Sequence, residues 1–376
     1  MATLVTNGGK RIPELGLKPG LLIDRTTVIY GPSDTGKTVI IKSIMKTLHD
    51  HIEQVLLVAP TEPSNRAYDG FVSQPLIHYR LYLPSPQSNK TKDTDLKAAT
   101  RFLESVYKRQ EMMAAIYTRA IRLKTLSALY ARLSHSERKR GDHYIVSLEQ
   151  KRRRVVDGVN RQHVNDPGLC VQKVKEVNKK FEKMLVLVYK KFLTPHVDRL
   201  WTIKDLHDDE RCSLHYLHFN PRLLLIFDDC AAELKPLFNG EIFRKLFYQN
   251  RHSYITIIIG CQDDTDLPTN LRKNAFISIY TDSIVCQSNF DRISNRFPKE
   301  TKAYISEIIS DVFIGFRKLA YIREDDKRQH FYHLTCSYPT PSAFGSNALS
   351  ELCAAVRSEG VTMDTDNPFY ERFRVV

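Results

Sequence analysis

Short apolar runs along the chain set its predicted architecture. Residues 26–30, 55–59, 222–227 and 255–260 are dominated by β-branched or other apolar side chains, and polar or chain-breaking residues bound each run. Runs of this length without alternation are typical of strands that are buried on both faces of a parallel sheet. Residues 39–48 (VIIKSIMKTL) instead repeat their apolar positions at helical spacing. The pattern therefore predicts an α/β fold.

A different pattern occupies residues 96–192. Glycine and proline become sparse there, and helix formers dominate. This stretch contains 23 Lys and Arg against 9 Asp and Glu, whereas the net charge of the whole chain is +13. Essentially all of the excess positive charge therefore lies in one predicted helical insertion.

The densest basic cluster in this insertion is the run that follows Lys151, namely Arg152, Arg153 and Arg154. We interpret these three arginines as candidate DNA contacts, because a basic, helical surface suits a polyanionic partner. Two alternatives remain open at this point. The cluster could be an ordinary solvated helical face, or it could serve as a nuclear-localisation signal.

Composition narrows the class of protein further. With 376 residues, of which 42% are hydrophobic, the chain can fill a large core. No run of about 18 apolar residues occurs, so we expect no membrane segment. The seven cysteines are scattered and odd in number, and the first residues lack the apolar centre of a signal peptide. We therefore expect an intracellular protein.

The candidate chemistry begins directly after the first apolar run. Residues 31–38 read GPSDTGKT and match G-x-x-x-x-G-K-[ST], the phosphate-binding loop of P-loop NTPases. A predicted strand precedes the loop and a predicted helix follows it, which is the context that the motif requires. The loop predicts ATP binding by Gly31, Pro32, Ser33, Asp34, Thr35, Gly36, Lys37 and Thr38. Lys37 would reach the β- and γ-phosphates, and the Thr38 hydroxyl would hold Mg²⁺.

Two carboxylates complete the predicted site. Asp228 and Asp229 end the apolar run at 222–227, as in the Walker B motif. Asp228 would hold Mg²⁺ and Asp229 would polarise the attacking water. Gln262, which follows the run at 255–260, could sense the γ-phosphate.

The motifs and the change in composition together predict a division of the chain. Residues 1–95 form the first half of a P-loop ATPase domain, and residues 96–192 form the basic helical insertion. Residues 193–335 form the second half, with a C-terminal β-hairpin that turns at Asp325–Arg328. Residues 336–376 form a tail rich in Ser, Pro and Asn.

The motifs in this order resemble the genome-packaging ATPases of poxvirus-like large DNA viruses and Polinton-type elements, within the FtsK–HerA superfamily. The resemblance extends from about residue 26 to residue 335 and rests on these segments: GPSDTGKT, APTEPSNRAY with Asn65 and Tyr68, LLLIFDD, the Arg-His pair at 251–252, the strand that ends in Gln262, LPTNLRKNA and AYIREDDKRQHFYHLT. It implies a RecA-like (ASCE-type) sheet with an extra strand between the P-loop and Walker B strands.

The resemblance also implies a function and partners. It implies a homo-oligomeric ring, commonly hexameric, that uses ATP and Mg²⁺ to move double-stranded DNA into a capsid. Gln262 is then the sensor, and Arg251 is the candidate arginine finger for a neighbour's nucleotide, with Arg272 as the alternative. Viral capsid proteins would be partners, and the protein would act at a virus assembly site, in the nucleus or the cytoplasm, and in the virion.

Two features depart from the wider superfamily. Asp34 places an acid inside the phosphate loop, which is unfavourable unless its side chain turns outward. Asp229 occupies the position of the second Walker B acid, where many relatives carry the longer Glu.

Two other functions account for fewer of these sequence features. A P-loop nucleotide or small-molecule kinase would leave the basic insertion unexplained, and a non-hydrolysing DNA-binding scaffold would not need both Walker motifs intact. A separate zinc site at His207, Cys212, His215 and His218 matches no established ligand spacing.

Overall fold

The structure is a computed structural model that describes residues 3–81, 92–292, 299–323, 330–345 and 351. The turn predicted at Asp325–Arg328 and most of the predicted tail lie outside these residues. The chain forms two compact units. One combines Met1–Met112 with Pro221–Val376 and is called the sheet unit, and the other, Met113–Asn220, is called the helical unit.

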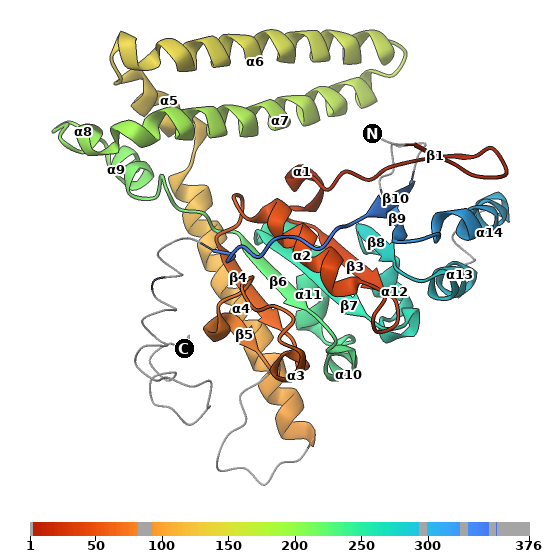
Figure 1. Cartoon of the computed structure of the whole chain (residues 1–376). Coiled ribbons are helices and arrows are strands. Elements are labelled where there is room, and N and C mark those ends of the chain that lie inside the picture. Colours follow the sequence, from red (N-terminus) through yellow and green to blue (C-terminus); the bar gives the residue numbers. More distant parts are fainter. Residues whose placement is uncertain (1–2, 82–91, 293–298, 324–329, 346–350, 352–376) are drawn as a thin grey trace. The chain divides into compact units, whose positions relative to one another are not determined.

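The sheet unit is built on a mixed sheet whose described part has eight strands in the order β10-β9-β8-β3-β7-β6-β4-β5 (Figure 1). All neighbours from β8 to β5 are parallel, whereas β9 and β10 form an antiparallel hairpin that pairs with β8. The strands are β3 (Thr26–Tyr30), β4 (Gln54–Val58), β5 (Ile77–His78), β6 (Leu223–Phe227), β7 (Ile255–Cys261), β8 (Ile277–Tyr280), β9 (Arg317–Ile322) and β10 (Phe331–Thr335).

Strand β7 lies between β3, which precedes the phosphate loop, and β6, which precedes the two aspartates. Ile259 of β7 is in register with Val28 on one side and with Phe227 on the other. This order confirms the predicted α/β RecA-like sheet with an extra strand between the P-loop and Walker B strands. It also brings the carboxyl ends of β3, β6 and β7 to one edge of the sheet.

Helices cover both faces of this sheet (Figure 1). One face packs Ile29, Leu57 and Ile258 against the buried side of α2 (Lys37–Leu48). The opposite face packs Val28 and Ile257 against helices that come from distant parts of the chain. These helices are the first turns of α4 (Lys92–Ala120), α11 (Glu241–Gln249), α13 (Ser283–Arg292) and α14 (Lys299–Val312). Burial on both faces explains why the central strands are continuous apolar runs.

Short elements complete the sheet unit. A separate two-stranded sheet pairs β1 (Thr3–Val5) with β2 (Arg11–Pro13) in antiparallel fashion. The remaining α-helices are each a single turn, and most lie in loops between strands. They are α1 (Pro19–Leu22), α3 (Glu62–Asn65), α10 (Ala231–Leu234) and α12 (Thr269–Arg272).

The helical unit contains the end of α4 and five further α-helices. They are α5 (Leu123–Ala131), α6 (His135–Gln162), α7 (Pro167–Leu193), α8 (Val197–Trp201) and α9 (Asp208–His215). A small core of its own joins Leu126 and Leu129 of α5 to Leu193 and Leu214. The predicted insertion at 96–192 and this unit differ in extent, because composition changes near residue 96 whereas packing against the sheet continues through Leu103 and Tyr107.

Helices α6 and α7 pack side by side as a long hairpin (Figure 1). Ser134 begins α6 with a capping box, in which its hydroxyl accepts from the Glu137 amide and the Glu137 carboxylate accepts from the Ser134 amide. Along the 28 residues of α6 only Gly141 is buried. None of the described helices is both long and apolar enough to cross a membrane.

Candidate active site

The predicted phosphate loop joins β3 to α2 through a left-handed residue at the start of the helix. Gly36 stands at the helix N-cap with φ of 93°, a left-handed value that glycine adopts at little cost. The loop therefore directs backbone amides and the positive end of the α2 dipole toward the carboxyl edge of the sheet. Asp34 also has a positive φ, 61°, and its side chain is exposed. The acid in the loop is thus turned to solvent.

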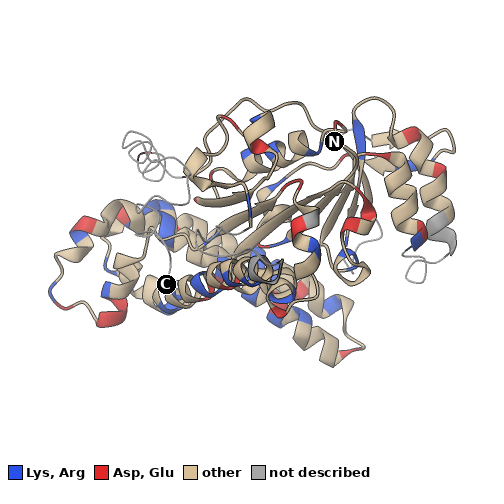
Figure 2. Ribbon diagram, turned by 90° about the horizontal axis from the view of Figure 1, so that it is seen from below, with Lys and Arg blue, Asp and Glu red and all other residues tan. Residues whose placement is uncertain are grey.

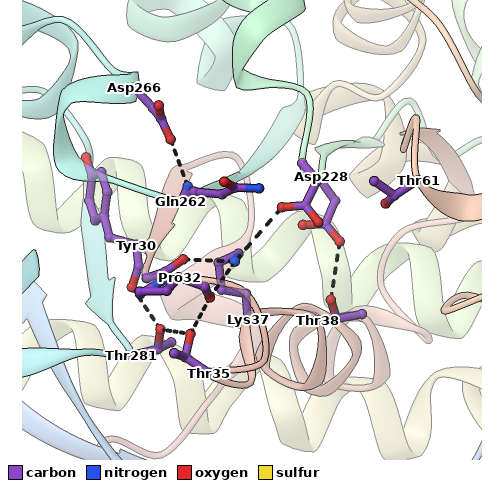
Figure 3. Close-up of polar contacts among 12 residues, drawn as sticks. Tyr30, Pro32, Thr35, Lys37, Thr38, Thr61, Asp228, Gln262, Asp266 and Thr281 are labelled. Carbon is purple, nitrogen blue, oxygen red and sulfur yellow. Dashed lines mark hydrogen bonds and ion pairs between the residues drawn. The ribbon is translucent and has the colours of Figure 1, made fainter. Parts of the chain in front are cut away.

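Lys37 is the charged centre of the loop. Its side chain is only 4% exposed, and its Nζ donates to the carbonyl oxygens of Gly31 at 2.8 Å and Pro32 at 2.9 Å (Figure 3). The same ammonium lies 3.9 Å from Oδ1 of Asp229. The structure therefore brings the predicted phosphate-binding lysine beside the second Walker B acid.

Asp228 and Thr38 face each other across the two loops. The Thr38 hydroxyl donates to Oδ2 of Asp228 at 3.4 Å, and the Asp228 side chain is buried (Figure 3). Burial raises the pKa of Asp228 above its ordinary value, and its hydrogen bond with Tyr68 opposes that rise. Oδ1 of Asp228 is buried and has no hydrogen-bond partner. A buried carboxylate whose Oδ1 has no partner and whose Oδ2 faces a threonine hydroxyl fits Mg²⁺, which prefers hard oxygen ligands.

Glycine in the middle strand makes room for this carboxylate. Gly260 lies on β7, next to the end of β6, and a Cβ placed there would come within 2.5 Å of Oδ1 of Asp228. Any larger residue would displace the aspartate. The glycine that closes the predicted strand 255–260 therefore contributes to the site through the space that it leaves.

Gln262 lies at the same edge of the sheet, just after β7. Its backbone amide donates to Oδ2 of Asp266 at 2.8 Å, and its side chain is exposed. Figure 3 shows this side chain on the same side of the sheet as Lys37 and Asp228. The structure thus gathers Lys37, Thr38, Asp228, Asp229 and Gln262 from three separate strand ends.

The two candidate arginine fingers lie in contrasting surroundings. Arg251 belongs to a short 3₁₀ turn before β7, at the end of that strand opposite Gln262, and its side chain is exposed. No hydrogen bond or ion pair of the described residues involves it, so it does not cap the preceding helix. Arg272 is buried, donates to Thr269 and is paired with Asp264, which is 0% exposed. Arg272 is therefore committed to the interior of its own chain.

The three arginines of the basic cluster also separate. Arg152 is half-buried and donates to Glu149 at 2.9 Å and to Asn178 at 3.0 Å. Arg153 and Arg154 are exposed. Figure 2 shows Lys and Arg distributed along the helices of the chain. Only the second and third arginines of the cluster are thus directed to solvent.

Sequence reasoning assigned no role to two residues that the fold brings to this site. In the sequence Tyr68 stands out only as part of the segment APTEPSNRAY, yet its hydroxyl donates to Oδ2 of Asp228 at 2.7 Å. Lys318 of β9 donates to the carbonyl of Thr281 at 3.2 Å, and its Cε lies 4.0 Å from where a Cβ on Gly36 would be. No local pattern could have found Lys318, because the hairpin that carries it is about 280 residues away in the sequence. His207, Cys212, His215 and His218 form no zinc site, since the described residues contain no group of three or more His, Cys, Asp or Glu that could hold a metal ion.

Comparison with known proteins gives close relatives and distant structural matches. No family model matches the chain. The uncharacterized protein B354L of African swine fever virus is 49% identical over 375 residues, which cover 99% of both chains, in isolates from Malawi and South Africa.

Among solved structures, the genome packaging NTPase B204 from Sulfolobus turreted icosahedral virus 2, in complex with ATP-gammaS, is 12% identical. The match covers 82% of this chain and 96% of that chain, with a TM-score of 0.34. VirB4 of Thermoanaerobacter pseudethanolicus is 11% identical, with coverage of 84% and 90% and a TM-score of 0.34. Because these TM-scores are low, the fold assignment rests on the strand order of the sheet and on the phosphate loop rather than on these matches.

Proposed function

The chain belongs to the same family as the B354L proteins of African swine fever virus, and we propose that it is an ATP-driven translocase of double-stranded DNA that packages a viral genome into a capsid. The proposal has an ATPase part, a DNA part and a packaging part. Each part is supported by different observations and can fail separately.

The ATPase part is carried by one observation. Lys37, Thr38, Asp228 and Asp229 come from two loops that are about 190 residues apart, and they meet at the carboxyl edge of a P-loop sheet. Lys37 would bind the β- and γ-phosphates of ATP, and Thr38 with Asp228 would hold Mg²⁺. Bound Mg²⁺ would neutralise charge on the phosphates. Asp229 would orient the attacking water, and Gln262 would contact the γ-phosphate.

The DNA part rests on charge. The region 96–192 holds almost the entire positive excess of the chain, and Arg153 and Arg154 on α6 are exposed. Neutralising DNA phosphates releases counterions, which gives affinity without sequence preference. A motor that moves along a genome requires that kind of contact.

A ring is proposed because neither candidate arginine is placed to serve the site of its own chain. Arg272 is paired with Asp264, whereas Arg251 is exposed and lies at the end of β7 away from Gln262. Arg251 is therefore better placed to act on a neighbouring subunit's nucleotide than on its own. A finger supplied in this way would tie hydrolysis to the closure of the subunit interface.

DNA-stimulated ATP hydrolysis tests the first two parts together. Phosphate release is measured with and without linear duplex DNA for the wild type and for Lys37→Ala. We expect turnover that DNA stimulates, and none from Lys37→Ala. Turnover that ignores DNA would favour the alternative, a P-loop kinase. DNA binding without any turnover would favour a non-hydrolysing DNA-binding scaffold.

Packaging requires its own test in infected cells. When expression of this protein is repressed, we expect capsids that contain no DNA to accumulate at the assembly site. Co-purification with capsid proteins would support a packaging role, and the compartment in which the empty capsids accumulate would show whether assembly is nuclear or cytoplasmic. Normal DNA content in the particles would remove packaging and leave a DNA-dependent ATPase of another purpose.

A further inference from the structure

Tyr68 forms a buried contact with the aspartate that would hold the metal. It lies in the loop after β4, is 1% exposed, and donates its hydroxyl to Oδ2 of Asp228 at 2.7 Å. The Thr38 hydroxyl donates to the same oxygen at 3.4 Å. The phenol is the donor in this bond, because a carboxylate oxygen accepts. One carboxylate oxygen is thus held by two hydroxyl groups while Oδ1 has no hydrogen-bond partner.

The position of Tyr68 is itself fixed from two directions. Its backbone amide donates to Oε1 of Glu62 at 2.8 Å, which closes the loop. Over the ring lies the ammonium of Lys42, 5.7 Å from the ring centroid. Lys42 belongs to α2, the helix that begins at the phosphate loop, and is only 1% exposed.

Lys42 is enclosed by aromatic rings. Its Nζ lies 4.8 Å from the centroid of Phe71 and 4.5 Å from that of Tyr338, and it donates to the Tyr338 hydroxyl at 2.5 Å. The ion pairs of the described residues include none with Lys42. The negative faces of such rings stabilise a desolvated ammonium, and the Glu62 carboxylate attracts it from farther away. We call Lys42, Tyr68, Phe71 and Tyr338 the lysine cage.

We propose that Tyr68 is a positioning residue for the metal-binding carboxylate Asp228. Lys42, held by the other rings of the lysine cage, keeps the Tyr68 ring in place. The inference rests on the proposed ATPase function and adds a residue to that site. By fixing Oδ2, Tyr68 restricts the rotation of the carboxylate and so sets the direction in which it would meet the metal. Groups that orient metal ligands in this way typically change metal affinity about 10- to 100-fold when removed.

The lysine cage connects the proposed metal site to a segment that follows the last strand. Tyr338 lies after β10, in a segment that is anchored to Phe71 of the cage and to His49. In this segment the Phe344 amide donates to the Phe71 carbonyl at 2.8 Å, and the carbonyl of Ala343 lies 2.9 Å from Nε2 of His49. The position of Asp228 therefore depends on residues that follow the C-terminal hairpin.

Magnesium-dependent nucleotide binding tests the proposal without relying on turnover. The affinity of the full chain for a fluorescent ATP analogue is measured in EDTA and in Mg²⁺, and the ratio reports how strongly metal and nucleotide support each other. Tyr68→Phe keeps the ring and removes only the hydroxyl. We expect affinity in EDTA within about twofold of the wild type and a loss of about tenfold in the ratio. Tyr338→Phe keeps the ring and removes only the hydrogen bond from Lys42, so it should reduce the ratio less, by about threefold.

Tyr107→Phe is the matched control. Tyr107 is also buried in the sheet unit, and its hydroxyl donates to Gln249 at 3.1 Å, away from Asp228. It should leave the ratio unchanged. A wild-type ratio in Tyr68→Phe would overturn the Tyr68 inference and leave the ATPase proposal standing. Should Tyr68→Phe not fold, an unchanged ratio in Tyr338→Phe, whose side chain is 63% exposed, would overturn the inference. If the wild type binds no nucleotide, both proposals fail.

Discussion

The interior of the sheet unit and the α6–α7 hairpin of the helical unit hold their charged side chains in opposite ways. In the sheet unit Lys37, Lys42, Asp228 and Arg272 are each less than one-tenth exposed, and each has named partners at short distance. In the helical unit most basic side chains of the α6–α7 hairpin are exposed, and α6 buries only Gly141. Charge is thus positioned individually in one unit and accumulated on a surface in the other.

This difference predicts how each unit responds to mutation. A buried charge that loses its partner remains desolvated, so a single substitution has a large effect that salt does not screen. An exposed charge contributes a small share to a summed field, and salt weakens it. Changes in the sheet unit should therefore act on catalysis by orders of magnitude, whereas changes in the helical unit should act on DNA affinity in small, additive steps.

Substitution of Arg251 should have the largest effect. Arg251 is an exposed cation of the sheet unit, yet catalysis should depend on it. We expect Arg251→Ala to lower DNA-stimulated hydrolysis about 10³- to 10⁵-fold, as for a finger supplied in trans. Mixed with Lys37→Ala subunits, it should regain part of the activity, because an intact loop can then face an intact arginine. Phosphate release from defined mixtures measures this recovery. Mixed rings that form but stay inactive would contradict the assignment.

Asp229 should separate binding from hydrolysis. Asp229→Asn keeps the side-chain volume and removes the charge that would polarise water. We expect ATP affinity close to that of the wild type and turnover lower by about 10²- to 10⁴-fold, the range for loss of a general base. Nucleotide binding and phosphate release are measured on the same preparation. Undiminished phosphate release would transfer the role to another acid, Asp228 or the buried Glu62.

Arg153 and Arg154 test the surface-charge side of the comparison. Because the slope of log affinity against log salt changes by about 0.9 for each phosphate contact, the double change to Gln should make it shallower by about 1.8. Fluorescence anisotropy of labelled duplex DNA between 50 and 200 mM salt measures this slope.

Arg152→Gln is the matched control for this slope, since Arg152 is held by Glu149 and Asn178. It should leave the slope unchanged while weakening the packing of α6 on α7. An unchanged slope in the double variant would mean that Arg153 and Arg154 contact no DNA phosphate. This part of α6 would then be an ordinary solvated face or a nuclear-localisation signal.

Ser134 gives the smallest effect and tests whether the helical unit is stabilised locally. Ser134→Ala removes the hydroxyl of the capping box, which should cost about 1 kcal/mol of helix stability. Hydrogen exchange should accelerate in α6 and remain unchanged in β3 and β6. Ser134→Asp, which restores a capping acceptor, should recover the protection. Faster exchange in the strands as well would show that the two units unfold together.

The sequence by itself determined the local features. The strand predicted at 26–30 is β3 without a change of bounds, and those predicted at 222–227 and 255–260 differ from β6 and β7 by one residue. The phosphate loop was also recognisable from the sequence alone. Such features are encoded by consecutive residues, since a buried strand needs an apolar run and a phosphate loop needs its glycines at fixed spacing.

Only the tertiary structure decided which residues of similar chemistry face the site. Tyr68 and Asp228 are 160 residues apart, so no local periodicity places the phenol on the carboxylate. The same holds for the pairing that withdraws Arg272 from the surface and for the contacts that hold Arg152. A side chain's type is written in the sequence, but its burial and its partner depend on the order of strands and the packing of helices from distant segments. Those long-range contacts turn two strand-end aspartates, a lysine and a tyrosine into one site.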